Sequence, residues 1–551
     1  MAVLLWADVF AGYVMWVMIT YLTDVWKISF THAAGIVNIW SGVAMIMPIG
    51  SAFLVDTLIG NYSMLLLSSI AYSIGLGFLA MSTPPVLHNA TGTCREYRPE
   101  CIGHVQQILF YAALALIAVG ISGHVISLGS FSAEQTTSDT EEDDETKTRK
   151  FLWQILGIFA IILVLVIAAT ALAYIKPWSV RFGIPAICTL VATIIFLGGS
   201  CSYNYESPKG SPLTTVFRVF AASAAKLFQQ LPSDSNQLYE KDEPDFKPLP
   251  HTPSLRCFDK AAIMLPTPTQ EEQEKNRWRL CRVTEVEETK MGIRMIPMWM
   301  TFIICGVVLS IGNTYFLEQA NHMNRKVGRL TVPLPFLLVL YDFSKSQFAK
   351  IYAGLAKCLG KYAPPVCIAL AMLFSILCCI TAAKVETRRL DVIRRHGLLD
   401  KPDEKIPMSM FWLLPQFILL AGLDQIFNMS ITGFLINQAP ATMKTKEYLD
   451  IFTTGVLGLG TAGSVLSVYI VGKISEKGGK PSWFRYTLNK SRLDNYYWTL
   501  AALSAVNLVL FIVVASFYSY KEPRVEDQEA PEVDESDEPY DDNAQCFCCC
   551  G

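Results

Sequence analysis

Charged side chains are scarce in this sequence, and their scarcity argues against a soluble protein. Only 17% of the 551 residues are Asp, Glu, Lys or Arg, whereas soluble proteins carry about 25%. Basic residues (45) do not outnumber acidic ones (48), and the formal net charge is −3. The chain therefore lacks the basic excess with which proteins attract nucleic acid, and no nucleic acid partner is expected.

Signatures of enzymes and of metal sites are missing too. The 15 cysteines show no zinc-binding spacing, and no motif places a nucleophile beside a base. The glycine-rich GLGTAG at 458–463 lies inside a long apolar run, where a phosphate-binding loop would not be found. We expect no enzyme activity, no cofactor and no metal. The first apolar stretch has no basic flank and no small-residue cleavage site, so no cleavable signal peptide is expected.

Long apolar runs are what the sequence has in abundance. Hydrophobic residues make up 52% of the chain, and a membrane span needs about 20 of them in succession. Each run is expected to be helical, because lipid cannot satisfy the backbone of an open strand edge. Their number and length argue against core helices of a large soluble enzyme. Twelve runs qualify, near 3–23, 34–55, 63–81, 106–128, 151–175, 182–200, 293–316, 331–352, 364–383, 409–436, 451–473 and 497–518.

The runs fall into two groups of six, separated by a polar stretch. That stretch contains LPSDSNQLYEKDEPDFKPLPHTPS, whose Pro, Ser and acidic residues are typical of a mobile linker. We predict an all-α membrane protein with twelve transmembrane helices in two six-helix bundles, a plan used by secondary transporters, with both termini on one side. The expected domains are an N-terminal bundle over 1–200, a cytosolic linker over 201–290, a C-terminal bundle over 291–520 and a disordered acidic tail over 521–551.

Counts of basic residues leave the orientation open. A short link at 344–361 carries Lys345, Lys350, Lys357 and Lys361, as a cytosolic link would. The link between the ninth and tenth runs, KVETRRLDVIRRHGLLDKPDEK, carries seven basic residues but should lie on the opposite side.

Two segments outside the runs are candidates for modification. HNATGTCREYRPEC offers a glycosylation sequon at Asn89, and a disulfide between Cys94 and Cys101 is feasible if this loop is lumenal. The tail ends in CFCCCG, and S-acylation or a free cysteine cluster are both open interpretations. The acylation candidates are Cys546, Cys548, Cys549 and Cys550.

Six stretches, in order along residues 10–523, resemble the plant nitrate transporter 1/peptide transporter family. They include IVNIWSGVAMIMPIGSAFLVDTLIGNY, FGIPA with YESPKGSPLTTVFRVFAA, RCFDKAAI, WRLCRVTEVEETKMGIRMIPMW, MSMFWLLPQFILLAGLDQIF with NQAPATMK, and TLNKSRLDNYYWTLAALSAVN. The resemblance implies the major facilitator superfamily fold, in agreement with the number of runs. It also implies alternating access, in which rocking of the two bundles moves a solute across the membrane.

The family's proton-coupling residues are replaced in this chain. The family has Glu-x-x-Glu-Arg in span one, met by a Lys in span four; the resemblance places Asp8 at the second Glu, with Leu5 and Val9 at the first Glu and the Arg. The Lys position is Val125, beside His124. An Asp within a span costs about 2.5–3.5 kcal/mol, and without partners desolvation keeps it largely neutral. If His124 reaches Asp8, the two side chains could still exchange a proton; otherwise Asp8 is a tolerated polar residue in a wet cavity.

The resemblance also marks a cleft residue in span ten. Asp424 falls where the family has a Glu that faces the cleft, and it is a candidate for solute binding or gating. Gly433 replaces the second acid of that span, which weakens the case for recognition of a peptide amine. Leu309 stands where the dual-affinity nitrate transporter carries its nitrate-binding His, so that mode of binding is not supported either.

A loop after the second span is a candidate gate. Asp56 and Gly60 retain most of the superfamily's Asp-x-x-x-Gly-Arg loop, with Asn61 in place of the Arg. The resemblance implies a structural role in gating for this loop rather than contact with solute.

These observations favour a secondary transporter in the plasma membrane or the vacuolar membrane. Its expected partners are membrane lipids, a small-molecule solute (nitrate or another small anion, a peptide or a metabolite) and, where coupling survives, protons. The broken motif favours weakened coupling. The alternative is a membrane receptor or sensor that keeps the transporter fold without transport.

Overall fold

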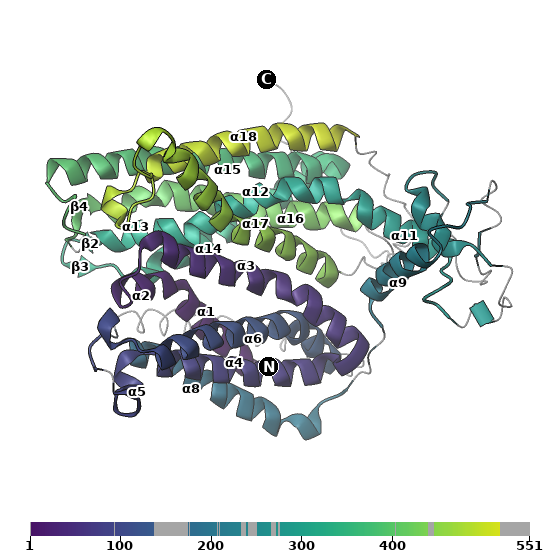
Figure 1. The fold of residues 1–551 in the computed structure, drawn as a ribbon, viewed down its shortest axis with the longest axis horizontal. Helices are drawn as coiled ribbons and strands as arrows, with labels where there is room; N and C mark the ends of the chain where they lie inside the picture. The colour runs from purple at the N-terminus through teal and green to yellow at the C-terminus, as the bar shows by residue number, and fades with distance from the viewer. Residues whose placement is uncertain are drawn as a thin grey trace, which may run out of the picture. The chain divides into compact units, whose positions relative to one another are not determined.

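A computed structural model describes residues 2–517, apart from 93, 137–174, 176, 206–207, 209, 233–237, 241–248, 250, 266–271, 274–275, 403 and 439–445 (Figure 1). Nearly all of the expected span 151–175 lies outside the described residues. So does the tail 521–551 with Cys546, Cys548, Cys549 and Cys550. The expectations for these segments therefore stay predictions.

Helices account for nearly all of the regular structure. The N half contains α1 (Ala2–Trp16), α2 (Met18–Asp24), α3 (Phe30–Leu54), a π-helical turn (Val55–Ile59), α4 (Gly60–Met81), α5 (Pro84–Thr91), a 3-10 turn (Pro99–Cys101), α6 (His104–Thr136) and α8 (Trp178–Gly198). The C half contains α11 (Val283–Arg294), α12 (Ile296–Ile311), a π-helical turn (Gly312–Phe316), α13 (Leu317–His322), α14 (Pro335–Leu359), α15 (Ala363–Arg395), α16 (Leu414–Gln438), α17 (Lys446–Ser475) and α18 (Leu493–Phe517).

Short strands order two loops of the C half. β1 (Met323–Asn324) pairs in parallel with β4 (Ile406–Ser409), and β2 (Lys326–Val327) forms a hairpin with β3 (Leu330–Thr331). The sequence did not predict these strands. They fix the loop between α13 and α14.

Nine helical stretches among the described residues are long and apolar enough to cross a membrane. Phe30–Met81 and Pro335–Arg395 each contain two of the predicted spans, so the described stretches account for eleven of the twelve runs. Large apolar side chains such as Ile187 and Ile194 on α8 and Val509 on α18 lie exposed. A soluble protein rarely tolerates such faces, whereas lipid covers them.

The two halves meet where α3 packs against α17 (Figure 1). The helices approach closely because glycines face one another: a Cβ on Gly42 would lie 2.6 Å from the Gly458 carbonyl oxygen. Small residues at helix crossings are the usual means of close approach in membranes. Asn38 Nδ2 donates a hydrogen bond to Ser464 Oγ at 3.0 Å across this contact. The GLGTAG stretch therefore serves helix packing.

Part of the predicted linker is folded. α9 (Pro212–Ala225) and a 3-10 turn (Arg256–Ala262) pack with α11. Their buried core consists of Val219, Ala222, Leu238, Ala261, Ala262, Ile263, Cys281 and Val286. The composition of the stretch suggested only a mobile linker, because its few apolar residues are spread too thinly to show helical periodicity.

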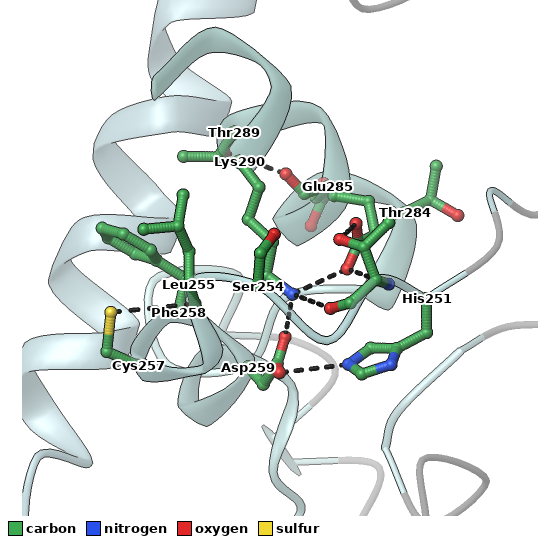
Figure 2. A network of polar contacts seen from close by, with 12 residues as sticks. His251, Ser254, Leu255, Cys257, Phe258, Asp259, Thr284, Glu285, Thr289 and Lys290 are labelled. Atoms are coloured by element: carbon green, nitrogen blue, oxygen red, sulfur yellow. Dashed lines mark hydrogen bonds and ion pairs between the residues drawn. The ribbon is translucent and has the colours of Figure 1, made fainter. Parts of the chain in front are cut away.

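A buried ammonium group fastens the linker to α11. Lys290 Nζ lies 2.5 Å from Asp259 Oδ1 and 2.7 Å from Glu287 Oε1, and it donates to the Thr252 carbonyl at 3.1 Å. Figure 2 shows Lys290 reaching toward Asp259, whose other oxygen lies 3.0 Å from His251 Nε2. The cluster of His251, Asp259 and Glu287 has the donors of a metal site, but the Lys290 ammonium already supplies the positive charge there. We call Thr252, Asp259, Glu287 and Lys290 the linker clasp.

Replacing the clasp lysine is expected to release the linker. Lys290→Met leaves two buried carboxylates without their cation, and breaking a buried pair from one side costs about 3–5 kcal/mol. The purified variant should be cut in residues 251–265 several times faster than the wild type in limited proteolysis. Lys480→Met, at an exposed lysine, is the control and should digest like the wild type. Equal digestion of Lys290→Met would contradict a clasp.

The linker should also respond to pH. Burial lowers the pKa of Lys226 to about 8, although its Nζ donates to the carbonyls of Ala261 at 3.1 Å and Ile263 at 2.6 Å. An unfolded lysine has a pKa of about 10.4, so the unfolded linker binds more protons above pH 8. The folded linker is therefore expected to gain stability between about pH 8 and 10. Proteolysis, calibrated with an unfolded peptide at each pH, should slow between pH 7.5 and 9.5, and Lys226→Met should remove this trend.

Candidate functional site

A cavity of about 670 Å³ lies between the two halves. α1 and α3 of the N half and α12, α14, α16 and α17 of the C half supply its walls. Apolar and aromatic side chains form much of the lining, among them Trp16, Trp40, Met45, Leu309 and Leu457. Polar groups are added by Tyr13, Asn38, Ser41, Ser310, Asn313, Tyr341, Asn428, Thr454 and Thr461, and charged groups by Asp342, Lys345 and Asp424. We call this the central cavity.

An ion pair between α14 and α16 stands in the central cavity. Lys345 Nζ lies 2.7 Å from Asp424 Oδ2, and Tyr341 donates its hydroxyl to the same oxygen at 2.8 Å. Asn428 Nδ2 donates to Asp424 Oδ1 at 2.7 Å. Both carboxylate oxygens are thus engaged, with the Asp424 side chain 16% and the Lys345 side chain 31% exposed.

Lys345 was missed at the level of sequence. The sequence places Lys345 in a basic link at 344–361. In the structure α14 runs on to Leu359, so Lys345 lies within the helix and faces the cavity. A usable signal was present: Tyr341 and Lys345 are four residues apart, as are Asp424 and Asn428, and residues at that spacing share one helix face.

Asp8 and His124 meet in a second cavity, within the N half. His124 Nδ1 lies 2.7 Å from Asp8 Oδ1, and its Nε2 lies 2.8 Å from Ser69 Oγ. Tyr72 packs edge-on against the imidazole, with ring centroids 5.5 Å apart. This cavity measures about 650 Å³ and shares Gly12 with the central cavity. Asp8 therefore has a partner, and the two side chains lie beside the central cavity rather than at the Lys345–Asp424 pair.

The candidate gating loop lies at the linker end of the halves. Asp56 is in the π-helical turn, and Gly60, with φ of +72°, adopts the left-handed conformation that glycine tolerates best. The Asp56 carbonyl accepts from Gly210 N at 2.9 Å. Asp56 also lines a cavity of about 400 Å³ whose wall includes Thr454, which lines the central cavity as well. The two cavities therefore share a wall at this end.

The opposite end carries the modification candidates. Asn89 is exposed in α5, and Cys94 and Cys101 are bonded, with their Cα atoms 4.8 Å apart. Tyr97 Oη, in the same loop, lies 3.1 Å from Ser179 Oγ at the start of α8. α8 thus begins beside the disulfide loop and ends toward the linker.

Comparison with known proteins identifies the family. Residues 62–484 match the POT family (PTR2). The chain belongs to the POT family. It is 43% identical over 527 residues to Protein NRT1/PTR FAMILY 5.5 of Arabidopsis thaliana, covering 94% of this chain and 96% of the relative. It is 32% identical to NRT1/PTR FAMILY 5.6 of the same plant, covering 92% and 87%.

Solved POT family structures share the fold. An auto-inhibited POT family peptide transporter superimposes with a TM-score of 0.63 at 16% identity, covering 96% of this chain and 98% of that one. The transporter PepTSo gives 0.62 at 15% identity, covering 94% and 96%. The predicted resemblance, the all-α membrane fold and the exclusion of an enzyme are confirmed. This POT family member is a multi-pass membrane transporter of small solutes.

The disulfide end is expected to face away from the cytosol, because disulfides persist in oxidising compartments. Asn89 should then carry a glycan in a eukaryotic host, and a tag after Gly551 should lie on the cytosolic side. Glycosidase treatment should increase the mobility of the wild type but not of Asn89→Gln. A tag protected on the lumenal or extracellular side would overturn this topology.

Proposed function

We propose that this transporter carries a small organic solute with an anionic group, by alternating access through the central cavity. The observation that carries the proposal is the Lys345–Asp424 pair in a cavity lined by both halves. Lys345 supplies the cation for the solute. The facing halves supply the surfaces that rocking would separate.

The size and lining of the cavity favour an organic solute over nitrate. Cavities of about 300–1,000 Å³ with apolar walls and a few placed polar groups are typical of sites for organic ligands. Trp16 and Trp40 offer such walls. Asp342 lines the same cavity as Lys345 and Asp424, so a solute that carries an amine as well as a carboxylate can satisfy both signs of charge. Nitrate, favoured by the sequence, is the competing solute.

The ion pair links solute binding to helix arrangement. When a solute anion binds the Lys345 ammonium, it competes with Asp424 for the same charge. Asp424 then keeps its hydrogen bonds from Tyr341 and Asn428. The direct ion pair between α14 and α16 is replaced by a contact through the solute. This replacement is the proposed trigger for the rocking of the two halves. The receptor alternative gains no support from the relatives or from the cavity.

Uptake of labelled solutes by expressing cells tests the proposal. Lys345→Met should raise the KM for carboxylate-bearing solutes about tenfold or more, as expected for loss of a charge-assisted hydrogen bond, and Lys345→Arg should restore part of the affinity. Lys357→Met, at an exposed lysine on the same helix, is the control. Unchanged KM in Lys345→Met would overturn the role of Lys345, and saturable uptake of nitrate alone would overturn the organic solute.

A further inference from the structure

A fourth cavity lies at the disulfide end, between the two halves. It measures about 350 Å³ and is lined by Arg181 and Trp178 of α8, Asp24 of α2, and Arg325 in the loop between β1 and β2. Thr331 of β3 also lines it. We call this the arginine vestibule. Its charged groups come from both halves.

The Arg181 side chain and the backbone of Arg325 are held in place. Arg181 donates through Nη2 to the Ile175 carbonyl at 2.8 Å, and its guanidinium lies 4.3 Å from the centre of the Trp178 ring. Such stacking orients the guanidinium. Arg325 precedes the β2–β3 hairpin, which the strand pairs fix. The vestibule therefore combines an oriented Arg181 guanidinium with an arginine on a fixed backbone.

Among the residues that the structure describes, cations outnumber carboxylates around the vestibule. Asp24 interacts electrostatically with Arg181 and Arg325. Lys405 lies close to Arg325, and burial lowers the pKa of Lys405 with Arg325 lowering it further. Asp24 also interacts electrostatically with Lys27, Glu318 and His322. Glu318 Oε1 lies 3.0 Å from His322 Nε2. The two carboxylates, Asp24 and Glu318, are thus outnumbered by the two arginines together with Lys27 and Lys405. An additional anion is favoured in such surroundings.

The vestibule adjoins the central cavity. Tyr13 and Pro335 line both. Pro335 begins α14, and Lys345 lies ten residues further along the same helix. At 1.5 Å per residue this is a distance of about 15 Å.

We propose that the arginine vestibule is a binding station for the anionic group of the solute, between the extracytosolic side and Lys345. This inference rests on the proposed function, because it assumes a solute with an anionic group. The anionic group of the solute first displaces Asp24 from Arg181 and Arg325. The solute then moves along α14, and its anionic group displaces Asp424 from Lys345. Each step replaces one carboxylate by another, so no cation is left unpaired on the path.

The charge of the vestibule is testable without transport. A cysteine introduced by Thr331→Cys in the purified full-length protein is treated with an anionic (sulfonatoethyl) or a cationic (trimethylammonioethyl) methanethiosulfonate. Mass spectrometry of the peptide gives the two rates. The anionic reagent should react about tenfold faster, since clefts of one charge sign concentrate counter-ions by that order. Adding Arg325→Gln should lower the rate ratio several-fold, Arg325→Lys should restore it, and Asp24→Asn should raise it.

Uptake separates this proposal from the proposed function. Arg325→Gln should raise the KM for external carboxylate-bearing solutes several-fold with little change in the maximal rate, and Arg485→Gln, at an exposed arginine outside the vestibule, should change neither KM nor the rate ratio. Equal rates for the two reagents, or an unchanged KM in Arg325→Gln while Lys345→Met is impaired, would overturn the vestibule alone. A KM that Lys345→Met does not alter would overturn the proposed function.

Discussion

Asp424→Asn is expected to lower solute uptake tenfold or more at unchanged surface expression. The Asp424 carboxylate accepts from Lys345, Tyr341 and Asn428. An amide in its place carries no charge, so the Lys345 ammonium would lose the carboxylate that lies 2.7 Å from it. A tenfold loss corresponds to about 1.4 kcal/mol, less than the cost of breaking a fully buried pair, because Lys345 is partly solvated. The measurement is initial uptake normalised to surface protein.

Exchange of the two charges provides the control for Asp424→Asn. The double variant Lys345→Asp with Asp424→Lys keeps the pair and reverses its direction, so it should regain part of the activity that either single substitution loses. Effects of groups that act as one unit are not additive. Uptake by the double variant could instead fall by the product of the two factors that the single substitutions cause. In that case Lys345 and Asp424 act independently, and the proposed exchange at Lys345 is wrong.

The sequence was most informative where lipid dictates the structure. Apolar runs must become helices in a membrane, so the runs were located without knowledge of packing. The resemblance identified Asp424 because one motif in span ten fixes its position. Lys345 escaped notice because a lysine near the end of an apolar run is equally compatible with a link, and only its pairing with Asp424 distinguishes the two.

Contacts between distant segments were the least predictable. The sequence allowed His124 to reach Asp8 but could not show that α6 brings Nδ1 to 2.7 Å from the carboxylate. The linker clasp joins Asp259 to Lys290 on α11 through burial that no local pattern encodes. Arg325 and Arg181 are 144 positions apart in the chain and share a cavity only because both halves contribute to it.

Uptake is expected to depend only weakly on the proton gradient. The sequence resemblance places Leu5, Val9 and Val125 at the family's coupling positions, and none of these side chains can bind a proton. The Asp8–His124 pair can bind a proton, and it lies beside the central cavity rather than in contact with Lys345 and Asp424. Its charge therefore affects the solute site indirectly. Uptake should change less than about threefold between pH 5.5 and 7.5, an interval in which a histidine titrates, and a protonophore should have a correspondingly small effect.

Substitutions at Asp8 and His124 test whether this pair accounts for the dependence of uptake on pH that remains. Asp8→Asn should leave a substantial fraction of uptake, and more than Asp424→Asn leaves, because the amide can still accept a hydrogen bond from His124 while the solute-binding pair is untouched. His124→Gln keeps hydrogen-bonding groups toward Ser69 but cannot take up a proton, so its uptake should depend on pH less than that of the wild type. A steep, protonophore-sensitive rise at acid pH in His124→Gln would place coupling elsewhere. The same rise in the wild type, abolished by Asp8→Asn, would make Asp8 a full proton site and refute weak coupling.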